Sequence, residues 1–411
     1  MNEHISPFLV PFPDMPQIDG VKISTVETGM RYKNRDDLML MEFCEGTNVA
    51  GVFTKNKMPG EPIKWCKKIL PNGIARALIV NAGVANVFTG SDGYNDVEKT
   101  ARAVAETLGC DEEEVYVSST GVIGEPLETE KIIENINDLK NSLSSSSDMW
   151  SKAAKAILTT DTFHKGITRT AYIGAEQVTI NGFIKGSGMI EPDMATMLGY
   201  IVTDANIPAE IMQKWLNEDV EISYNSMTVD SDTSTSDTVL FFATGKKEHW
   251  DVTGINDPAW FDFKEKLKEI NIEMAKMVAR DGEGITKFIT IDISGAESNN
   301  AARKIGKSIA NSPLVKCAVA GEDPNWGRIT MAIGKSGEKI DQKLTQIWIG
   351  DNLIAENSHV HPNYDEEQTA QYMKNSEISI KVDVGIGTGQ ATVWTMDLTY
   401  EYIRINVDYR S

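Results

Sequence analysis

Cysteine, histidine and long apolar runs are all scarce in this chain of 411 residues. The four cysteines show no Cys-x-x-Cys spacing, so we expect reduced thiols in a cytoplasmic protein rather than a disulfide framework or a zinc site. The five histidines are equally dispersed, and we expect no metal site. No run approaches the roughly 20 apolar residues that a membrane helix needs. Residues 1–20 resemble neither a secretory signal nor a transit peptide.

Positive charge is also in short supply. Lys and Arg number 40 against 60 Asp and Glu, which gives a formal net charge of −20. Such a surface repels the phosphates of nucleic acids and of anionic lipids, so we expect neither nucleic acid nor a membrane as a partner. Apolar residues, by contrast, make up 41% of the chain, which is ample for a large core and for two or three domain-sized units.

Strand-like and helix-like patterns alternate without a steady βαβ rhythm. We therefore predict an α/β or α+β fold in which layered sheets are flanked by helices. Two apolar runs, 38–44 and 49–54, flank a turn and predict a β-hairpin. The other expected strands are 75–83, 115–121, 197–202, 239–243, 288–293, 344–349 and 377–384. The expected helices are 95–108, 128–139, 149–158, 208–218, 259–279 and 299–312.

The most informative stretch is 184–198, where a glycine-rich, charged loop leads into Met-Ala-Thr and then into an apolar run. That run is typical of a buried strand, so Thr196 is expected where a loop enters a strand. The ordinary interpretation is one strand threonine among many. Alternatively, its hydroxyl attacks the carbonyl of Ala195, the amide becomes an ester, and water splits the ester. The new N-terminal amine, with an ordinary pKa of about 7.7–8.0, can then act as the base for the hydroxyl of the same residue.

The run Lys-Gly-Ser-Gly-Met-Ile-x-Pro-x-Met-Ala-Thr-Met-Leu resembles the cleavage signature of the ornithine acetyltransferase family, the glutamate N-acetyltransferases of arginine biosynthesis. Members of that family are made as one precursor and cut between Ala and Thr. The resemblance spans about Val21 to Ser411, and it implies a first chain of residues 1–195 and a second of 196–411. It also implies a sandwich of sheets flanked by helices, a threonine nucleophile at the start of the second chain, and an α2β2 assembly.

Thr120 and Gly121 end an expected strand. A Thr-Gly pair there is most often an ordinary turn, although its hydroxyl and backbone N–H could stabilise an oxyanion. The family's Ser-Thr-Gly-Val-Ile-Gly matches residues 119–124, and the resemblance implies that Thr120 and Gly121 form the oxyanion hole.

Two further motifs precede the expected cleavage point. Thr-Thr-Asp-Thr at 159–162 is by itself a turn at a helix end, and a lone lysine such as Lys185 is usually on the surface. A buried lysine beside the nucleophile could instead bind an amino-acid carboxylate. The resemblance implies that Lys185 and a threonine of the turn contact substrate, and we favour Thr162 over Thr160.

The second half of the chain supplies three more candidates. The run 281–284 follows a long helix, where acidic residues usually form a solvated cap. A carboxylate there could instead pair with the cationic amine of an ornithine-like substrate. The resemblance implies that Glu283, Asn406 and Ser411 reach substrate, with serine replacing the usual threonine at the last position.

Other segments are structural, or differ from the family. The run Gly-Ile-Gly-Thr-Gly at 385–389 lies between two expected strands, so it is a glycine turn rather than a dinucleotide-binding loop. The run 322–328 resembles a family motif that we interpret as structural. Ala82, Val84, the segment Pro59–Glu61 and Ser231 depart from the family's usual residues, and they leave the acceptor preference open.

The resemblance implies that Thr196 takes the acetyl group of N2-acetyl-L-ornithine and passes it to L-glutamate through an acetyl-Thr196 ester. That chemistry needs no metal and no bound cofactor. Use of acetyl-CoA as a second donor stays open at this point. Two alternatives remain: an N-terminal-nucleophile amidohydrolase or aminopeptidase in which water replaces glutamate, and an uncleaved paralogue that only binds a metabolite.

Overall fold

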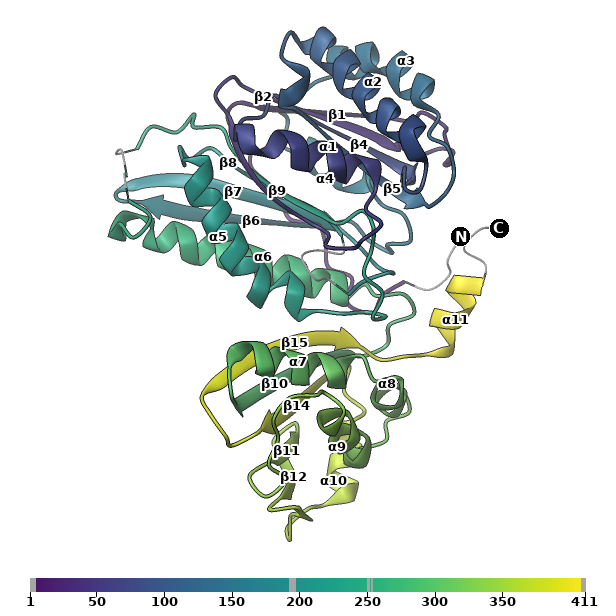
Figure 1. Ribbon diagram of the computed structural model, residues 1–411, viewed down its shortest axis with the longest axis vertical. Coiled ribbons are helices and arrows are strands. Elements are labelled where there is room, and N and C mark those ends of the chain that lie inside the picture. Colours follow the sequence, from purple (N-terminus) through teal and green to yellow (C-terminus); the bar gives the residue numbers. More distant parts are fainter. Residues whose placement is uncertain (1–4, 192–196, 250–251, 253, 408–411) are drawn as a thin grey trace.

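The computed structural model describes residues 5–191, 197–249, 252 and 254–407, which form three mixed sheets with helices on their faces (Figure 1). The first sheet has the order β1-β2-β4-β5, and the second β3-β9-β8-β7-β6. Their strands are β1 (Val21–Val26), β2 (Leu38–Phe43), β3 (Asn48–Phe53), β4 (Ala77–Val84), β5 (Val115–Val122), β6 (Lys165–Ile173), β7 (Glu176–Lys185), β8 (Leu198–Thr203) and β9 (Thr238–Ala243).

Helices enclose these two sheets and cover the third. They are α1 (Glu61–Ile69), α2 (Gly90–Leu108), α3 (Thr129–Asn141), α4 (Asp148–Ala156), α5 (Ala209–Ile222), α6 (Phe261–Ala279), α7 (Asn299–Ala310), α8 (Pro313–Ala320), α9 (Trp326–Gly334), α10 (Glu366–Tyr372) and α11 (Tyr400–Val407). Short 3-10 turns occur at Leu70–Asn72, Glu112–Glu114, Tyr224–Ser226 and Pro258–Trp260.

The first two sheets pack face to face through aromatic side chains. Phe43 on β2 stacks on Phe242 on β9, with ring centroids 4.3 Å apart. Successive residues of β8 serve two cores, because side chains alternate along a strand. Tyr200 belongs to the core between the sheets, whereas Ile201 belongs to the core under α5 and α6. With α1, α2 and α3 outside the first sheet, the layers run helix, sheet, sheet, helix (Figure 1).

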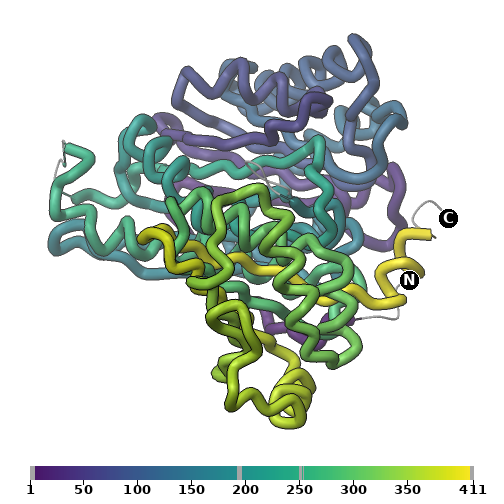
Figure 2. Tube along the Cα trace, turned by 60° about the horizontal axis from the view of Figure 1, so that its bottom comes forward, coloured from purple at the N-terminus to yellow at the C-terminus, as the bar shows by residue number. Residues whose placement is uncertain are grey.

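The third sheet has the order β13-β12-β11-β14-β10-β15 and a core of its own. Its strands are β10 (Phe288–Ala296), β11 (Gln346–Ile349), β12 (Asn352–Glu356), β13 (His359–Val360), β14 (Glu377–Asp383) and β15 (Gly389–Met396). The alternation in β14, where Ile378, Ile380 and Val382 are buried, turns one face toward α7 and α9. After β15 the chain returns toward the sandwich and ends in α11, on the same side as the first described residues (Figures 1 and 2).

The prediction of a β-hairpin over 38–54 is wrong. Its two runs form β2 and β3, but β2 pairs with β1 and β4 in the first sheet, whereas β3 pairs with β9 in the second. Both strands are buried nearly throughout, and a continuous apolar run carries no information about which sheet receives it. The predicted fold class is confirmed, since layered mixed sheets are flanked by helices. Residues 385–389 do connect two strands, as predicted.

No helix within the described part of the chain is long and apolar enough to cross a membrane. The same part of the chain contains no group of three or more His, Cys, Asp or Glu side chains arranged to hold a metal ion.

Candidate active site

The strand after the expected cleavage point lies at the centre of the second sheet. β8 begins at Leu198, which pairs with Lys185 at the end of β7. Ala195, Thr196 and Ser411 lie outside the described residues. Lys185 is therefore beside the first residue of the strand that follows the expected cleavage point.

The ends of β5 and β8 meet across the two sheets. Tyr116 contacts Phe242, with ring centroids 6.2 Å apart, and the Ser118 side chain lies beside the Tyr200 hydroxyl. Phe242 pairs with Val202 in β8, so moving from 116 to 118 along β5 corresponds to moving from 202 to 200 along β8. Continued in the same direction, this register brings Thr120 and Gly121 to the end of the sandwich where β8 begins.

Glycine is required at position 121 by close packing. Gly121 has a φ of +130° and pairs with Gly83 on the neighbouring strand. A Cβ at this position would lie 2.2 Å from the carbonyl carbon of Gly83, a distance that no side chain can occupy. Glycine at position 121 therefore lets β5 pass this close to the backbone of β4, whereas a Cβ on Gly83 would instead lie 2.9 Å from the Cβ of Arg31.

The turn at 159–162 supplies side chains to two of the predicted substrate residues. The Lys185 Nζ donates a hydrogen bond to the Thr159 hydroxyl at 2.9 Å. The Thr160 side chain interacts with the Glu283 carboxylate. The turn therefore links Lys185 at the end of β7 to an acidic residue just beyond α6.

Thr162, the residue favoured from the sequence, is bound differently. Its hydroxyl donates to the Asp281 carboxylate at 2.5 Å and accepts the N–H of Ser6 at 3.1 Å. This hydroxyl therefore acts as both donor and acceptor in hydrogen bonds within the protein. A substrate contact by Thr162 stays a prediction, and Thr159 and Thr160 are the members of the turn that contact Lys185 and Glu283.

A buried ion network underlies the turn. Lys165 lies between two carboxylates, 2.6 Å from Asp161 and 2.5 Å from Asp281, and all three side chains have no exposed surface. Asp161 also accepts the N–H of Gly186 at 2.6 Å. Burial acts to raise the pKa of Asp161, but the ammonium groups of Lys165 and Lys185 hold it below its ordinary value. Asp281 is therefore part of the core and not a solvated helix cap.

Lys185 is 9% exposed, and burial lowers the pKa of its ammonium group, while the Asp161 charge acts against this shift. The lysine is thus a buried cation with a neutral hydroxyl as its hydrogen-bond partner. A carboxylate entering the site would satisfy such a group well, because charge-assisted hydrogen bonds are stronger than neutral ones.

Glu283 meets the C-terminal helix. Its Oε2 accepts a hydrogen bond from the Asn406 side chain at 2.7 Å, and its N–H donates to the carbonyl of Ser187 at 3.1 Å. Burial raises the pKa of this carboxyl group. A Cβ on Gly188 would lie 2.4 Å from the Glu283 carboxyl carbon, so a side chain there would displace this carboxylate. The structure thus brings Glu283 and Asn406 together although 123 positions separate them.

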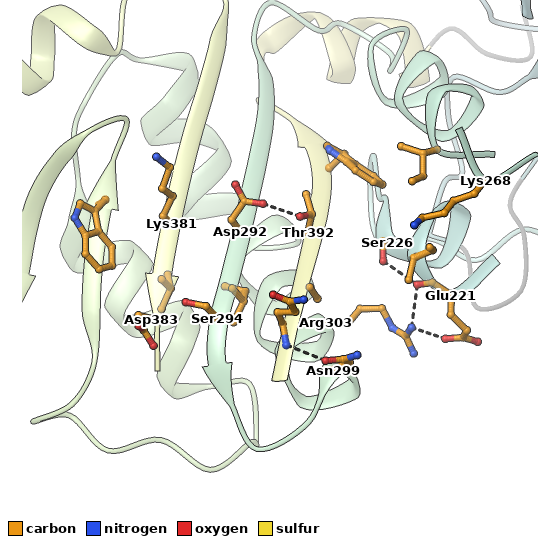
Figure 3. Close-up of a pocket in the computed structure, with 18 residues that line it drawn as sticks. Glu221, Ser226, Lys268, Asp292, Ser294, Asn299, Arg303, Lys381, Asp383 and Thr392 are labelled. Atoms are coloured by element: carbon orange, nitrogen blue, oxygen red, sulfur yellow. Dashed lines mark hydrogen bonds and ion pairs between the residues drawn. The ribbon is translucent and has the colours of Figure 1, made fainter. Parts of the chain in front are cut away.

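A separate cavity lies away from these residues. About 740 Å³ opens between the 3-10 turn after α5, helix α6 and the outer face of the third sheet (Figure 3). Its charged groups have partners: Arg303 pairs with Glu221, and Asp292 accepts a hydrogen bond from Thr392 at 2.7 Å. Of the predicted site residues that the structure describes, none lines it.

Sequence reasoning missed several residues of the site. Thr159, Asp161 and Lys165 were not singled out. The first two belong to the Thr-Thr-Asp-Thr motif. The motif therefore marked the right segment but did not show which of its side chains contact the other residues of the site. Lys165 follows Asp161 by four positions, but its second partner, Asp281, is 116 positions away, so the sequence does not show that it lies between two carboxylates.

Hydroxyls, a buried lysine and a buried carboxylate thus gather where the central strand of a layered α/β sandwich begins. This arrangement is typical of an acyl-transfer enzyme, in which a hydroxyl attacks a carbonyl carbon and nearby donors stabilise the oxyanion.

Comparisons with known proteins narrow that class. Residues 22–411 match the model of the ArgJ family. The arginine biosynthesis bifunctional protein ArgJ of Agrobacterium fabrum is 50% identical over 403 residues, which are 97% of each chain. The crystal structure of its counterpart from Bacillus halodurans is 39% identical, with a TM-score of 0.50, and the match covers 52% of this chain and 99% of that one. The Mycobacterium tuberculosis ornithine acetyltransferase complexed with ornithine is 31% identical, with a TM-score of 0.40, over 43% of this chain and 94% of that one.

The chain belongs to the ArgJ family. The predicted family and activity are confirmed: the protein is an acetyltransferase of arginine biosynthesis, a glutamate N-acetyltransferase of the bifunctional kind.

Proposed function

We propose that the chain cuts itself between Ala195 and Thr196 and then moves acetyl groups on the freed Thr196. The Thr196 hydroxyl attacks the Ala195 carbonyl, the C–N bond breaks, and the amine keeps the transferred proton. Water then hydrolyses the ester, which leaves a carboxylate on Ala195 and a free hydroxyl and amine on Thr196. Residues 1–195 and 196–411 remain together as two chains of one unit, and two units form an α2β2 assembly in the cytoplasm.

In the transfer reaction, the Thr196 hydroxyl attacks the acetyl carbonyl of N2-acetyl-L-ornithine, and its own amine takes the proton. The hydroxyl of Thr120 and the N–H of Gly121 stabilise the oxyanion. Ornithine leaves with a proton, and the amine of glutamate attacks the acetyl-Thr196 ester to give N-acetylglutamate. With acetyl-CoA as the second donor, the thiol of CoA leaves in place of ornithine. No step requires a metal or a bound cofactor.

Substrate recognition falls to the charged residues around the end of β7. The buried Lys185 ammonium binds a substrate carboxylate, and the Glu283 carboxylate binds a cationic amine of ornithine. Asn406 and Ser411 approach from the C-terminal end of the chain, and Thr162 borders the same turn. The hydrogen bond of 2.7 Å between Asn406 and Glu283 supports a shared site. Ala82 lies beside Thr120 in the strand register, so the departure from the family at this position bears on the acceptor.

One observation carries the proposal: the chain that follows residue 196 enters the central strand β8 at the end of the sandwich to which β5 brings Thr120 and Gly121. The coverage of the Bacillus halodurans structure supports a cut chain. The match takes in 99% of that chain but 52% of this one, close to the share that residues 196–411 represent.

The test is a comparison of Thr196→Ala with Thr196→Ser. The alanine variant should remain one full-length chain on a denaturing gel and transfer no acetyl groups, whereas serine keeps a hydroxyl and should permit both steps more slowly. Thr330→Ala, on an exposed face of α9, should behave as the wild type. Acetyl transfer by Thr196→Ala would show that Thr196 is not the nucleophile. Release of acetate without glutamate, at the rate seen with it, would favour the hydrolase.

A further inference from the structure

The six residues from Gly186 to Glu191, just upstream of the proposed cleavage point, are anchored along their length. Without these contacts they would be part of a plain loop between the antiparallel strands β7 and β8. The Gly186 N–H donates to Asp161, and the Ser187 hydroxyl donates to the carbonyl of Asp281 at 2.6 Å. Except for the Gly186 bond, the side chains and carbonyls that hold this segment come from beyond residue 196 in the sequence, as the following contacts show.

Asp230 makes the central contact. One carboxylate oxygen accepts the N–H of Met189 at 2.7 Å, and the other accepts the N–H of Ile190 at 2.8 Å. Met189 has a φ of +56°, a left-handed conformation that is unfavourable for a residue with a side chain. A carboxylate that holds two successive N–H groups offsets this cost and fixes the turn at Met189.

Asp230 is itself held firmly. The Val229 N–H donates to the carbonyl of Ile190 at 2.7 Å. The backbone next to Asp230 is therefore also bonded to the segment that its carboxylate holds. The Nζ of Lys316, a buried lysine on α8, donates to the carbonyl of Val229. Burial lowers the pKa of Lys316 to about 8, and the nearby Asp230 charge acts against this shift.

Glu191 forms a second anchor on α7 and on the turn that follows it. Its carboxylate lies 3.1 Å from Lys307 and accepts the side-chain N–H of Asn311 at 2.8 Å. Its carbonyl accepts the hydroxyl of Thr233 at 2.9 Å. The chain is therefore fixed in direction four residues before Ala195.

We propose that Asp230 is a positioning residue for self-cleavage, which holds the upstream chain so that the Thr196 hydroxyl can reach the Ala195 carbonyl. The proposal rests on the self-cleavage described above. Attack on a carbonyl needs the reacting atoms about 3–3.5 Å apart and aligned. The contacts of Asp230 and Glu191 fix the chain upstream of the bond, and β8 fixes it downstream from Leu198. After the cut, the same contacts keep the end of the first chain on the second.

The rival role is substrate binding, because the Tyr402 hydroxyl of α11 lies 3.5 Å from Asp230. The two roles separate when cleavage and transfer are measured independently. Asp230→Asn keeps the shape but leaves one of the two N–H groups facing an amide NH2. We expect full-length protein from cell-free translation to be cut at least about tenfold more slowly than the wild type. Acetyl transfer per cut molecule should stay within about twofold of the wild type.

Two further variants complete the test. Asp232→Asn removes the same charge from a neighbouring exposed residue and should cut at the wild-type rate. Glu191→Gln weakens the second anchor and should also slow cleavage, which keeps the test decisive if Asp230→Asn does not fold. Cleavage of Asp230→Asn at the wild-type rate would overturn the proposal, and so would loss of transfer in molecules already cut. A wild type that stays uncut would refute the self-cleavage itself.

Discussion

At the scale of single residues, the environment of Lys185 differs from what its type suggests. Lysine is usually solvated, yet this one is 9% exposed and hydrogen-bonds to a threonine hydroxyl. The sequence motif identified the residue by resemblance but could not reveal its burial or its partner. Those depend on the turn at 159–162, which lies 26 positions earlier and meets β7 only in the folded chain.

Replacing Lys185 with methionine should lower kcat/KM for N2-acetyl-L-ornithine by about ten- to a hundredfold, because a charged hydrogen bond is worth about 1.5–3 kcal/mol. Steady-state kinetics of the cut protein measure this. Lys152→Met is the matched control, since this lysine is exposed on α4 and pairs with Asp148 at 2.8 Å. Equal kcat/KM for Lys185→Met and the control would exclude Lys185 from substrate binding.

At the scale of elements, helices and strands were predicted better than the pairing of strands into sheets. Residues 259–279 were expected to be helical from their periodicity, and α6 spans Phe261–Ala279. By contrast, α2 begins at Gly90, five positions before the expected start. The prediction began too late because glycine has a low helix propensity, and Gly90 and Gly93 both lie in the first turn. The choice of sheet for β2 and β3 was missed because apolar runs fit any buried position. Sequence periodicity therefore reports burial and not pairing.

Lys165, at the start of β6, joins the carboxylates of Asp161 and Asp281. In Lys165→Met, the carboxylates of Asp161 and Asp281 would face each other without a cation, and removing one partner of a buried pair costs about 3–5 kcal/mol. Lys264→Met removes an exposed pair of similar length, 2.8 Å from Glu218, and should cost under about 1 kcal/mol. Urea unfolding of both variants measures the difference. Equal losses would show that the network contributes no more than a surface pair.

At the scale of the whole molecule, the proposed site is assembled from distant parts of the chain. Thr120 comes from the first sheet, Lys185 from the second, and Asn406 from the C-terminal helix (Figure 1). Motifs allowed these residues to be identified before the fold was known. The contacts of Lys185 with Thr159 and of Asn406 with Glu283 could not be inferred, because the layering of the sheets sets those distances. The same layering keeps residues on both sides of the proposed cleavage point in shared cores, so we expect the two proposed chains to stay together after a cut.

The most direct measurement is the intact mass of the purified protein before and after incubation with N2-acetyl-L-ornithine without glutamate. We expect two chains, the second starting at Thr196, and a gain of one acetyl group on that second chain alone. Adding glutamate should remove this gain as N-acetylglutamate forms. A single chain of 411 residues, or an acetyl group carried on the first chain, would contradict the account.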